Sequence, residues 1–400
     1  MDVIFAIPLA VVSVYLIVYA VYYSVYALVG LLPVSRSAVT DRLRTHVLLV
    51  PAHDEARTLP GILRALRAMD YPAGRVRIVV LADHCEDDTA RVATAVGAGV
   101  LERVDGDRGK GPALAWAFER LLADGEWDAV SVFDADNSVD PRFLRGVDAA
   151  LDGGAEAVQG YIDTKNPDES LLSGVSAIAY WSANRLFQAP RRRLGFGAVL
   201  GGTGLTLTRA LLERVPFEAT ALTEDLEYQA RLTLAGVRVA FAQDARVYDE
   251  KPASAGVSMR QRLRWMQGYW DVLTRFLPRL ALHGVRHTSV RSLEMAAYCA
   301  APPRSLLAAG LFGMGVLALL LPSDWWWLPI PAVSWFGTWL GFSLLPLLAM
   351  PLERAPARAY RSVPLIPVFA LSWAPLVVLG LLRRGSRAWS RTPHAADEGP

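Results

Sequence analysis

The sequence predicts an α/β protein that also has membrane-spanning helices, and two observations lead to this prediction. Short apolar runs alternate with helical patterns in the first third of the chain, in the order strand 46–50, helix 58–69, strand 76–82, helix 88–96, helix 110–122 and strand 129–133. Such alternation is typical of βαβ units with a parallel sheet. Charge-free apolar stretches flank this region on both sides. Because ligands bind beyond the carboxyl ends of the strands in open sheets, we expect the functional site at that edge.

The composition excludes several classes of protein. The chain has 400 residues, of which 53% are hydrophobic and 20% charged, so it is not a disordered chain. Its 41 basic and 39 acidic residues nearly balance, and we expect no nucleic-acid partner. Two cysteines, Cys85 and Cys299, support neither a disulfide framework nor a zinc site. Almost all cations are arginines, and the only lysines are Lys110, Lys165 and Lys251.

The N-terminal segment reads as a retained transmembrane helix within residues 1–35. Residues 3–33 carry no charge and are long enough to cross a hydrocarbon core of about 30 Å. A cleaved signal peptide would begin with basic residues and have a shorter apolar core. The positive-inside rule then places the α/β domain, residues 36–250, in the cytosol, because the apolar segment is followed by Arg36, Arg42 and Arg44.

The C-terminal part contains three charge-free stretches that are long enough to span, at 305–323, 325–352 and 362–382. Three crossings would place the Arg-rich end outside, against the positive-inside rule. Either one Pro-interrupted stretch is re-entrant or interfacial, or the region around Pro302-Pro303 hides another span. The predicted organisation is a multi-pass protein of the inner (plasma) membrane, with amphipathic interfacial helices at 251–300, two or three spans at 301–385 and a polar tail at 386–400.

The strongest local signal is Phe133-Asp134-Ala135-Asp136-Asn137 at the end of a predicted strand. Two carboxylates two residues apart, where a strand gives way to a loop, can both face one hard cation. Mg²⁺ or Mn²⁺ prefers such oxygen ligands and shares its remaining positions with substrate phosphates. An acidic turn without a metal is the alternative.

Polar residues also follow the other two predicted strands. Asp83 ends the second strand; the acids after it can cap a helix, whereas Asp83 could accept hydrogen bonds from a ribose or a base. Pro51 and Glu55 close the first strand, although a helix start at Thr58 explains part of this polarity. Lys110 begins a helix without a P-loop spacing, which the helix dipole disfavours unless an anion such as a phosphate lies nearby.

Two further segments allow either a structural or a chemical interpretation. Gly202-Thr203-Gly204 is a flexible turn that permits close backbone approach to a ligand, or it is a tight connection. Thr223-Glu224-Asp225 begins a helix, where capping and the helix dipole explain the acids without chemistry. An acid at the mouth of the sheet could instead serve as a general base.

The last motif is Gln261-Arg262-Leu263-Arg264-Trp265, within a helical stretch at 257–274. A basic amphipathic helix often lies on an anionic membrane surface. A more specific interpretation places the Arg264 guanidinium on a pyrophosphate and uses the Trp265 indole as a platform for a sugar ring.

The order of these motifs resembles that of the membrane-integrated family 2 glycosyltransferases, the group of cellulose, hyaluronan, chitin-oligosaccharide and poly-N-acetylglucosamine synthases. The resemblance covers about residues 45–270. It implies a GT-A fold, which is a mixed, Rossmann-like sheet that binds a nucleotide sugar, here flanked by transmembrane and interfacial helices. It also implies a nucleotide-sugar donor, typically a UDP-sugar, and Mg²⁺ or Mn²⁺ as cofactor.

The resemblance further implies roles for individual residues. Asp225 would be the general base, with Glu224 as the next choice, and Asp134 and Asp136 would hold donor and metal. The donor would also contact Pro51, Glu55, Asp83, Lys110, Gln261 and Arg264, and the acceptor would contact Gly202, Thr203, Gly204 and Trp265. Asp54 stands where the family usually has Asn, and His84-Cys85 where small polar residues are common, which bears on base or sugar specificity.

The predicted function is inverting transfer from a UDP-sugar onto a glycan at the membrane, as in a processive or oligomerising β-glycan synthase. The Q-x-x-R-W motif favours this function. The alternative is a single transfer onto a lipid-linked acceptor such as polyprenyl phosphate or diacylglycerol, which the small number of spans favours. A homo-oligomer or an accessory secretion subunit could complete a channel, and membrane lipids are the remaining partners. In a third interpretation, a transporter or scaffold, the acidic clusters only cap helices and bind no nucleotide.

Overall fold

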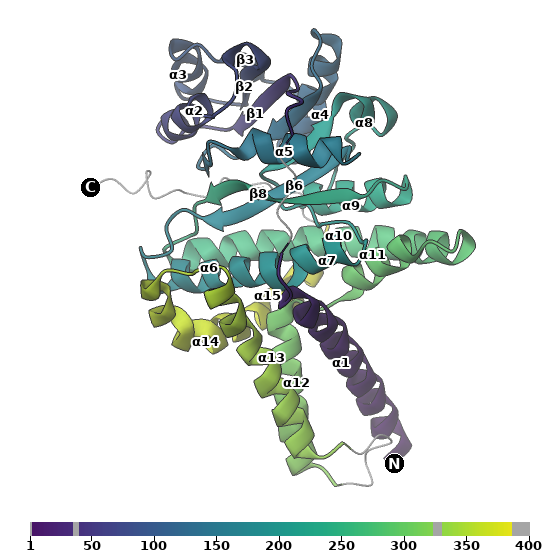
Figure 1. The fold of residues 1–400 in the computed structure, drawn as a ribbon. Coiled ribbons are helices and arrows are strands. Elements are labelled where there is room, and N and C mark those ends of the chain that lie inside the picture. Colours follow the sequence, from purple (N-terminus) through teal and green to yellow (C-terminus); the bar gives the residue numbers. More distant parts are fainter. Residues whose placement is uncertain (1, 35–39, 323–329, 386–400) are drawn as a thin grey trace.

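A computed structural model describes residues 2–34, 40–322 and 330–385 (Figure 1). Its centre is an eight-stranded mixed sheet in the order β3-β2-β1-β4-β7-β6-β8-β5. The three predicted strands are present, and β3 and the four C-terminal strands are additional. The strands are β1 (His46–Ala52), β2 (Val76–Asp83), β3 (Gly99–Arg103), β4 (Ala129–Val132), β5 (Ser138–Val139), β6 (Ala157–Thr164), β7 (Leu205–Thr208) and β8 (Val239–Asp249).

The two halves of the sheet differ in direction. Strands β3, β2, β1 and β4 run parallel, as the βαβ pattern predicts. Strand β7 runs antiparallel to both β4 and β6, because it begins at Leu205, beside the last residue of β4, Val132. The carboxyl ends of β1, β2 and β4 therefore meet at one edge, and the loop before β7 returns to that same edge.

Helices cover both faces of the sheet. Residues of β1 alternate, with Val47 and Leu49 buried in one hydrophobic cluster and Leu48 and Val50 in the other. This period of two follows from the pleat of a strand that is buried on both faces. One face packs against α2 (Leu59–Arg67), α3 (Thr89–Ala95) and α5 (Phe143–Asp152), and the other against α4 (Lys110–Ala123), α6 (Leu171–Ala183), α8 (Arg209–Arg214) and α9 (Glu224–Leu234).

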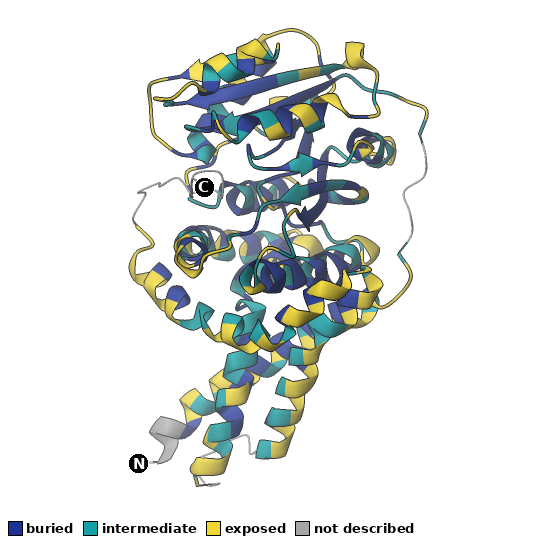
Figure 2. Cartoon of the chain, turned by 90° about the vertical axis from the view of Figure 1, so that its left-hand side faces the viewer, coloured by how far each residue is buried: buried dark blue, intermediate teal, exposed yellow. Residues whose placement is uncertain are grey.

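Two long helices, α10 (Ala255–Arg286) and α11 (Val290–Ala300), form the base of this domain, and three others project from it as a bundle (Figure 1). The bundle consists of α1 (Asp2–Gly30), α12 (Arg304–Leu320) and α13 (Ala332–Leu352). Its inner residues include Leu16, Leu311 and Trp335, while large apolar side chains such as Leu28 and Val333 are exposed outside (Figure 2). An exposed apolar surface of this extent is typical of a membrane-embedded bundle.

By length and composition, three helical segments of the described chain could cross a membrane: 6–30, 332–352 and 357–382. The predicted span at 305–323 corresponds to α12. By length and composition, α12 could form a membrane span only together with α11, and the two helices are bent by 64° relative to each other. The tryptophans at 325–327 and the tail at 386–400 lie outside the described residues.

The last apolar segment is broken rather than continuous. It consists of the 3₁₀ helix η4 (Ala357–Leu365), α14 (Ile366–Leu371) and α15 (Trp373–Leu382). Proline residues within or beside each piece prevent a regular hydrogen-bond ladder. Of these pieces, η4 packs against α6 and α15 packs along α10, while α14 contacts α12 of the bundle (Figure 1). The same segment, 357–382, is long and apolar enough to cross a membrane, so its re-entrant or interfacial placement stays a prediction.

Candidate active site

A cavity of about 840 Å³ opens at the carboxyl edge of β1, β2 and β4, between the sheet and α10. It brings together motifs that are up to 214 residues apart in the chain, from Pro51 to Trp265. Every predicted site residue except Gly204 lines it, namely Pro51, Glu55, Asp83, Lys110, Asp134, Asp136, Gly202, Thr203, Glu224, Asp225, Gln261, Arg264 and Trp265.

Asp83 is held rigidly at the end of β2. Its Oδ1 accepts a hydrogen bond from Arg103 Nη1 at 2.5 Å and lies 2.9 Å from His84 Nδ1. Its backbone carbonyl lies 2.7 Å from His53 Nδ1. Arg103 is itself buried, at the end of the neighbouring strand β3. The sequence pattern did not reveal Arg103, because the register of β3 against β2 places it there.

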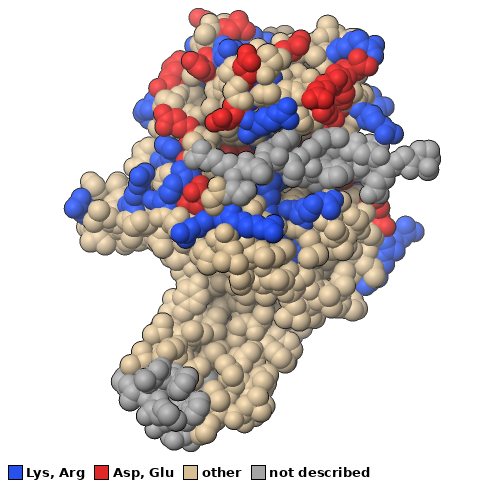
Figure 3. Space-filling model, turned by 180° about the vertical axis from the view of Figure 1, so that it is seen from behind, with Lys and Arg blue, Asp and Glu red and all other residues tan. Residues whose placement is uncertain are grey.

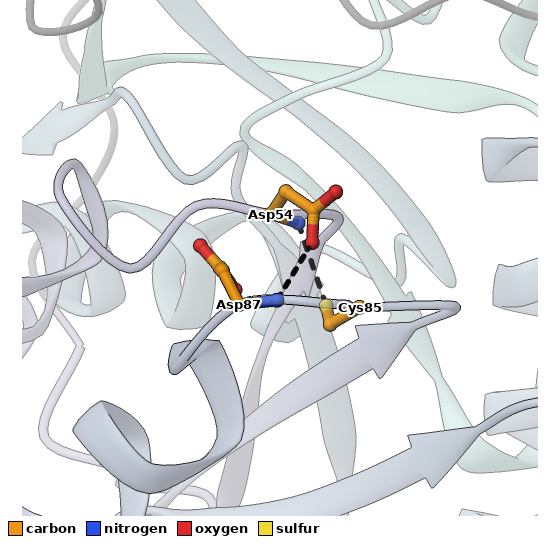
Figure 4. Close-up of side chains that lie close together, drawn as sticks. All are labelled: Asp54, Cys85 and Asp87. Atoms are coloured by element: carbon orange, nitrogen blue, oxygen red, sulfur yellow. Dashed lines mark hydrogen bonds between the residues drawn. The ribbon is translucent and has the colours of Figure 1, made fainter.

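A second acidic cluster lies behind this position, in the loops after β1 and β2 (Figure 4). The ligand atoms of Asp54, Cys85 and Asp87 lie within 4.8 Å of one another. Asp54 Oδ1 already accepts hydrogen bonds from the backbone N–H of Glu86 at 2.7 Å and of Asp87 at 3.2 Å. Asp54 has a positive φ of 54°, so these bonds offset a strained backbone. We interpret the cluster as a brace between the two loops.

The D-x-D loop is organised by the buried side chain of Asn137. Its Nδ2 donates to Asp136 Oδ1 at 3.0 Å and to Asp249 Oδ1 at 3.1 Å. Its Oδ1 accepts from the Thr203 hydroxyl and from the backbone N–H of Asp134. All four bonding positions of this amide are therefore used, and they hold the Asp136 carboxylate and the Asp134 backbone at the cavity wall.

The donor set at this loop fits a divalent cation. Asp134 and Asp136 both line the cavity and offer only oxygen atoms, which suits Mg²⁺ or Mn²⁺ better than a softer metal. When bound, such an ion supplies positive charge that neutralises the developing charge on a departing diphosphate. The residues at this loop therefore fit the metal that the sequence predicts.

Lys110, at the first turn of α4, lies between the carboxylates of Asp134 and Glu224. Its Nζ also donates to the carbonyl of Gly202 at 2.9 Å. Burial opposes the charge of this ammonium, but the carboxylates outweigh it and raise the pKa of Lys110. These anions explain why a lysine is tolerated at a helix N-terminus.

In the glycine turn, the first two residues line the cavity and the third packs within the sheet. Gly202 has a φ of 77° and lines the cavity beside Thr203. Gly204 does not line it: its backbone N–H donates to Val132 at 2.8 Å, and a Cβ there would lie 2.6 Å from Val247 Cγ1. Gly204 is therefore needed for close packing of β4, β7 and β8, which was the alternative interpretation of this turn.

The first turn of α9 holds acids in different environments. Glu224 is buried, and Asp225 is half-buried in the cavity wall. Burial raises the pKa of Asp225 to about 7, and the adjacent Glu224 carboxylate adds to this effect. Thr223 makes no side-chain capping bond, contrary to the expectation for a helix start. Its side chain instead packs against α10 at Gly268, where a Cβ would lie 2.6 Å from Thr223 Oγ1.

The Q-x-x-R-W motif faces the D-x-D loop from the opposite side of the cavity. Gln261, Arg264 and Trp265 project from α10 into it. Within the described parts of the chain, Arg264 forms neither a hydrogen bond nor a salt bridge. Its charge acts on Glu224 across the cavity without a direct contact, so the guanidinium keeps its donors available for an anionic ligand.

Sequence reasoning missed a polar group at the end of β8. Lys251 is buried, lies 2.5 Å from Asp249 Oδ2, and stacks on Tyr180 of α6 at 3.2 Å from the ring centroid. Lys165 donates to the Asp136 carbonyl at 3.1 Å. All three lysines of the chain thus lie in or beside the cavity, and their scarcity was the signal that could have found them.

A comparison with known families identifies the family of this chain. The sequence profile described as "Glycosyltransferase like family 2" matches residues 44–268, more than half of the chain. This chain belongs to the family 2 glycosyltransferases. It is therefore an enzyme of the inverting type, in agreement with the order of motifs in its sequence.

Curated members of the family differ in acceptor. The chain is 26% identical over 232 residues to β-monoglucosyldiacylglycerol synthase of Synechocystis, covering 55% of this chain and 47% of that protein. It is 24% identical over 242 residues to poly-β-1,6-N-acetyl-D-glucosamine synthase of Staphylococcus aureus, covering 59% and 57%. The chain thus spans about half the length of the curated relatives it matches.

The fold of this glycosyltransferase is that of the GT-A enzymes. A mannosyltransferase from Pyrobaculum calidifontis, solved in complex with GDP-Man and Mn²⁺, superimposes with a TM-score of 0.59. The match covers 94% of this chain and 98% of that one at 15% identity. The expected α/β class, with a mixed sheet and apolar helices at the ends, is confirmed.

Proposed function

We propose that this glycosyltransferase transfers one sugar from a UDP-sugar to the hydroxyl group of a membrane lipid. One observation carries the proposal: the cavity that contains the D-x-D and T-E-D acids extends to aromatic residues on helices of the base and bundle. These are Tyr23 of α1, Tyr298 of α11 and Trp373 of α15. A donor site at one end and an apolar, membrane-facing wall at the other suit an amphiphilic acceptor.

The donor would lie along the carboxyl edge of the sheet. Asp83, fixed by Arg103, would bind the nucleoside, with Pro51 and Glu55 beside it. Lys110, Gln261 and Arg264 would contact the diphosphate, as cations and donors suited to phosphate oxygens. Mg²⁺ or Mn²⁺, held by Asp134 and Asp136, would supply the remaining positive charge.

Asp225 would act as the general base. A lipid hydroxyl must lose a proton as it attacks the anomeric carbon, and a carboxylate with a pKa near neutrality matches that task. One in-line displacement then inverts the configuration at that carbon, and the proton passes to Asp225. A lipid phosphate is already ionised and needs no base, so this carboxylate favours a hydroxyl acceptor.

Close packing of the bundle supports a single transfer rather than secretion of a polymer. Between α1 and α12, a Cβ on Gly310 would lie 2.9 Å from Leu16 Cδ2. Between α12 and α13, a Cβ on Gly315 would lie 2.8 Å from Phe336 Cε1. Helices that touch this closely leave no room for a sugar chain between them.

Glycan elongation is the second candidate, and the Q-x-x-R-W motif favours it. Trp265 lines the cavity next to Arg264, where an indole can support the terminal sugar of a growing chain. This function would need a channel supplied by a second copy or by an accessory secretion subunit.

The location that fits this function is the inner membrane, with the sheet domain in the cytosol. Figure 3 shows Lys and Arg side chains in a band where the base meets the apolar bundle. Exposed arginines follow α13 at Arg354 and Arg358, and follow α15 at Arg383 and Arg384. This distribution agrees with the positive-inside rule if α12 and α13 are the two C-terminal crossings.

The test is a product analysis with the purified protein in phosphatidylcholine vesicles that contain diacylglycerol. The protein is incubated with Mn²⁺ and each of a panel of UDP-sugars, and products are measured by mass spectrometry. We expect one lipid species, heavier than diacylglycerol by a single hexosyl group or its derivative. A polymer ladder would instead support glycan elongation, and no UDP release with any donor would overturn both candidates.

A further inference from the structure

We infer that Trp373, on the last apolar segment, forms part of the acceptor site, and that Arg262 of the Q-x-x-R-W motif holds it in position. The inference rests on the proposed function, because it concerns how the lipid acceptor is bound. Neither residue belongs to the positions that the sequence motifs single out. Arg262 occupies a variable position of the motif, and Trp373 lies in a segment whose composition suggests only a membrane span.

Trp373 stands beside Trp265 at the cavity wall. Both indoles line the cavity, their ring centroids are 6.4 Å apart, and their planes differ by only 22°. That separation leaves no room for a ligand ring between them, so the two indoles form one continuous aromatic wall. Such a wall continues from the motif tryptophan toward the membrane-facing end of the cavity.

The segment that carries Trp373 is fixed against α10. Trp270 Nε1 donates to the Val377 carbonyl at 2.9 Å. A Cβ on Gly380 would lie 2.6 Å from Met266 Cβ, so α10 and α15 touch directly at this glycine. This contact places α15 beside the motif helix rather than in the bundle, as Figure 1 shows.

Arg262 holds the turn between α14 and α15. Its guanidinium is buried, donates from Nη1 to Ser372 Oγ at 2.7 Å, and lies 5.2 Å from the Trp373 ring and 4.7 Å from the Phe369 ring. No carboxylate among the described residues pairs with it. Its Nε also donates to the Ser258 carbonyl of the same helix at 3.3 Å. A buried guanidinium whose partners are one hydroxyl, one carbonyl and two aromatic faces, without a carboxylate, is costly to desolvate, which suggests a positional role for it.

The shape of this wall indicates the chemistry of the acceptor. An acceptor must present a hydroxyl group at Asp225 and an apolar portion along Trp265 and Trp373. A glycerolipid meets both requirements, because its free hydroxyl is only a few bonds from its acyl chains. A long glycan would instead place a second sugar ring against Trp373, and the lipid acceptor is the one that follows from the proposed function.

The experiment compares acceptor and donor parameters for matched variants in the diacylglycerol vesicles described above. Trp373→Ala should raise the KM for diacylglycerol about tenfold, the loss expected when a buried aromatic contact is removed. Its UDP dissociation constant and its rate of donor hydrolysis by water should equal those of the parent. Trp373→Phe should restore most of the acceptor affinity, because an aromatic face remains.

Arg262→Ala should reproduce the acceptor defect, and its control is Arg260→Ala, an exposed arginine on the same helix. If Arg262 acts through Trp373, the double variant should be no worse than Trp373→Ala alone. Additive defects would overturn the positional role of Arg262. An unchanged acceptor KM in Trp373→Ala, with transfer intact in the parent, would overturn the acceptor site. Absence of transfer in the parent would instead count against the proposed function.

Discussion

At the residue scale, three acids in the first turn of α9 have separate tasks because their surroundings differ. Glu227 is fully buried and accepts hydrogen bonds from Arg231, Arg275 and backbone N–H groups. Burial opposes its ionisation, but these partners lower its pKa and keep it charged. Glu224 contacts Lys110, whereas Asp225 faces the cavity. Asp225 accepts one backbone hydrogen bond, from Leu226 N–H at 2.8 Å, and makes no salt bridge within the described residues, so we propose it as the proton acceptor.

Replacement of the base should separate turnover from binding. We expect Asp225→Asn to lower turnover by about 10²-fold or more, because the acceptor hydroxyl loses its proton acceptor while the shape of the site is kept. UDP affinity, measured by calorimetry, should remain that of the parent. Glu224→Gln is the comparison, and turnover near the parent level in Asp225→Asn would identify another acid as the base.

The pH dependence of kcat/KM should change when Glu224, the neighbour of Asp225, is replaced. Turnover needs the ionised form of Asp225, so activity should rise with pH through about 7. Glu224→Gln removes a negative charge that raises the pKa of Asp225, so the acidic limb of kcat/KM should move to lower pH. A limb that stays in place or moves upward in this variant would contradict the assignment.

The D-x-D carboxylates should make the enzyme dependent on a divalent cation. A chelator should abolish transfer, and Mn²⁺ or Mg²⁺ should restore it. Asp136→Ala should lose both turnover and the stimulation of UDP binding by Mn²⁺, because a carboxylate ligand is removed. Full activity in the presence of the chelator would argue that lysines and arginines alone neutralise the diphosphate.

At the element scale, the contact between α10 and the start of α9 brings the two halves of the site together. Gly268 lies one helical turn after Trp265, and its missing side chain lets α10 approach Thr223. Arg275 of α10 pairs with Glu227 of α9 and so reinforces this contact, whereas Arg231 pairs with Glu227 within α9 itself. The close approach at Gly268 and the Arg275–Glu227 pair therefore both hold α10 against the start of α9.

A methyl group at Gly268 should push the helices apart. Gly268→Ala should destabilise the protein by about 1–3 kcal/mol, because a Cβ 2.6 Å from backbone and side-chain atoms cannot be accommodated without a shift. Gly256→Ala on the same helix is the control, since the nearest atom to its Cβ is the flexible end of Arg260 at 3.6 Å. Thermal unfolding in detergent measures the loss of stability, and the transfer assay measures the loss of turnover. Equal stability and turnover of the two variants would rule out the proposed contact.

At the scale of the whole molecule, the base separates the catalytic domain from the apolar bundle. Buried polar contacts join the two parts: Tyr161 of β6 donates to Glu353 Oε2, at the end of α13, at 2.7 Å. Tyr22 and Tyr26 of α1 donate to Glu294, which also pairs with Arg191. The bundle is thus fixed against the domain, and α14 and α15 lie at their junction.

This arrangement predicts the membrane topology. A cysteine at Arg384 should react with an impermeant thiol reagent only from the cytosolic side, because α15 returns to the base. A cysteine at Ala332, at the far end of the bundle, should react from the outside. Labelling in intact cells and in inverted vesicles measures both, with Cys85 replaced by Ser to remove background. Outside labelling at position 384 would show that the last segment crosses.

Much of the site could be predicted from the sequence because it depends on local order. Apolar runs that end in acids predicted β1, β2 and β4, and the edge where Asp83 and Asp134 meet follows from parallel strands. The strands β3 and β5 to β8 escaped prediction because their pairing, parallel or antiparallel, depends on partners that the local pattern does not identify. For the same reason, the contacts of Arg103 and Asn137 in the site could not be predicted, whereas the scarcity of lysines could have pointed to Lys251.

The chemistry could be predicted from local properties of the chain: the acids at the strand ends, the lysine at a helix start and the length of the apolar segments. What each of these groups contacts depends on the tertiary structure. It placed Gly204 in the sheet instead of the cavity, and it placed Trp373 beside Trp265, 108 residues earlier in the chain. Hydrophobic periodicity reports that a segment is buried, but not whether lipid or protein covers it, and that choice depends on packing between distant elements.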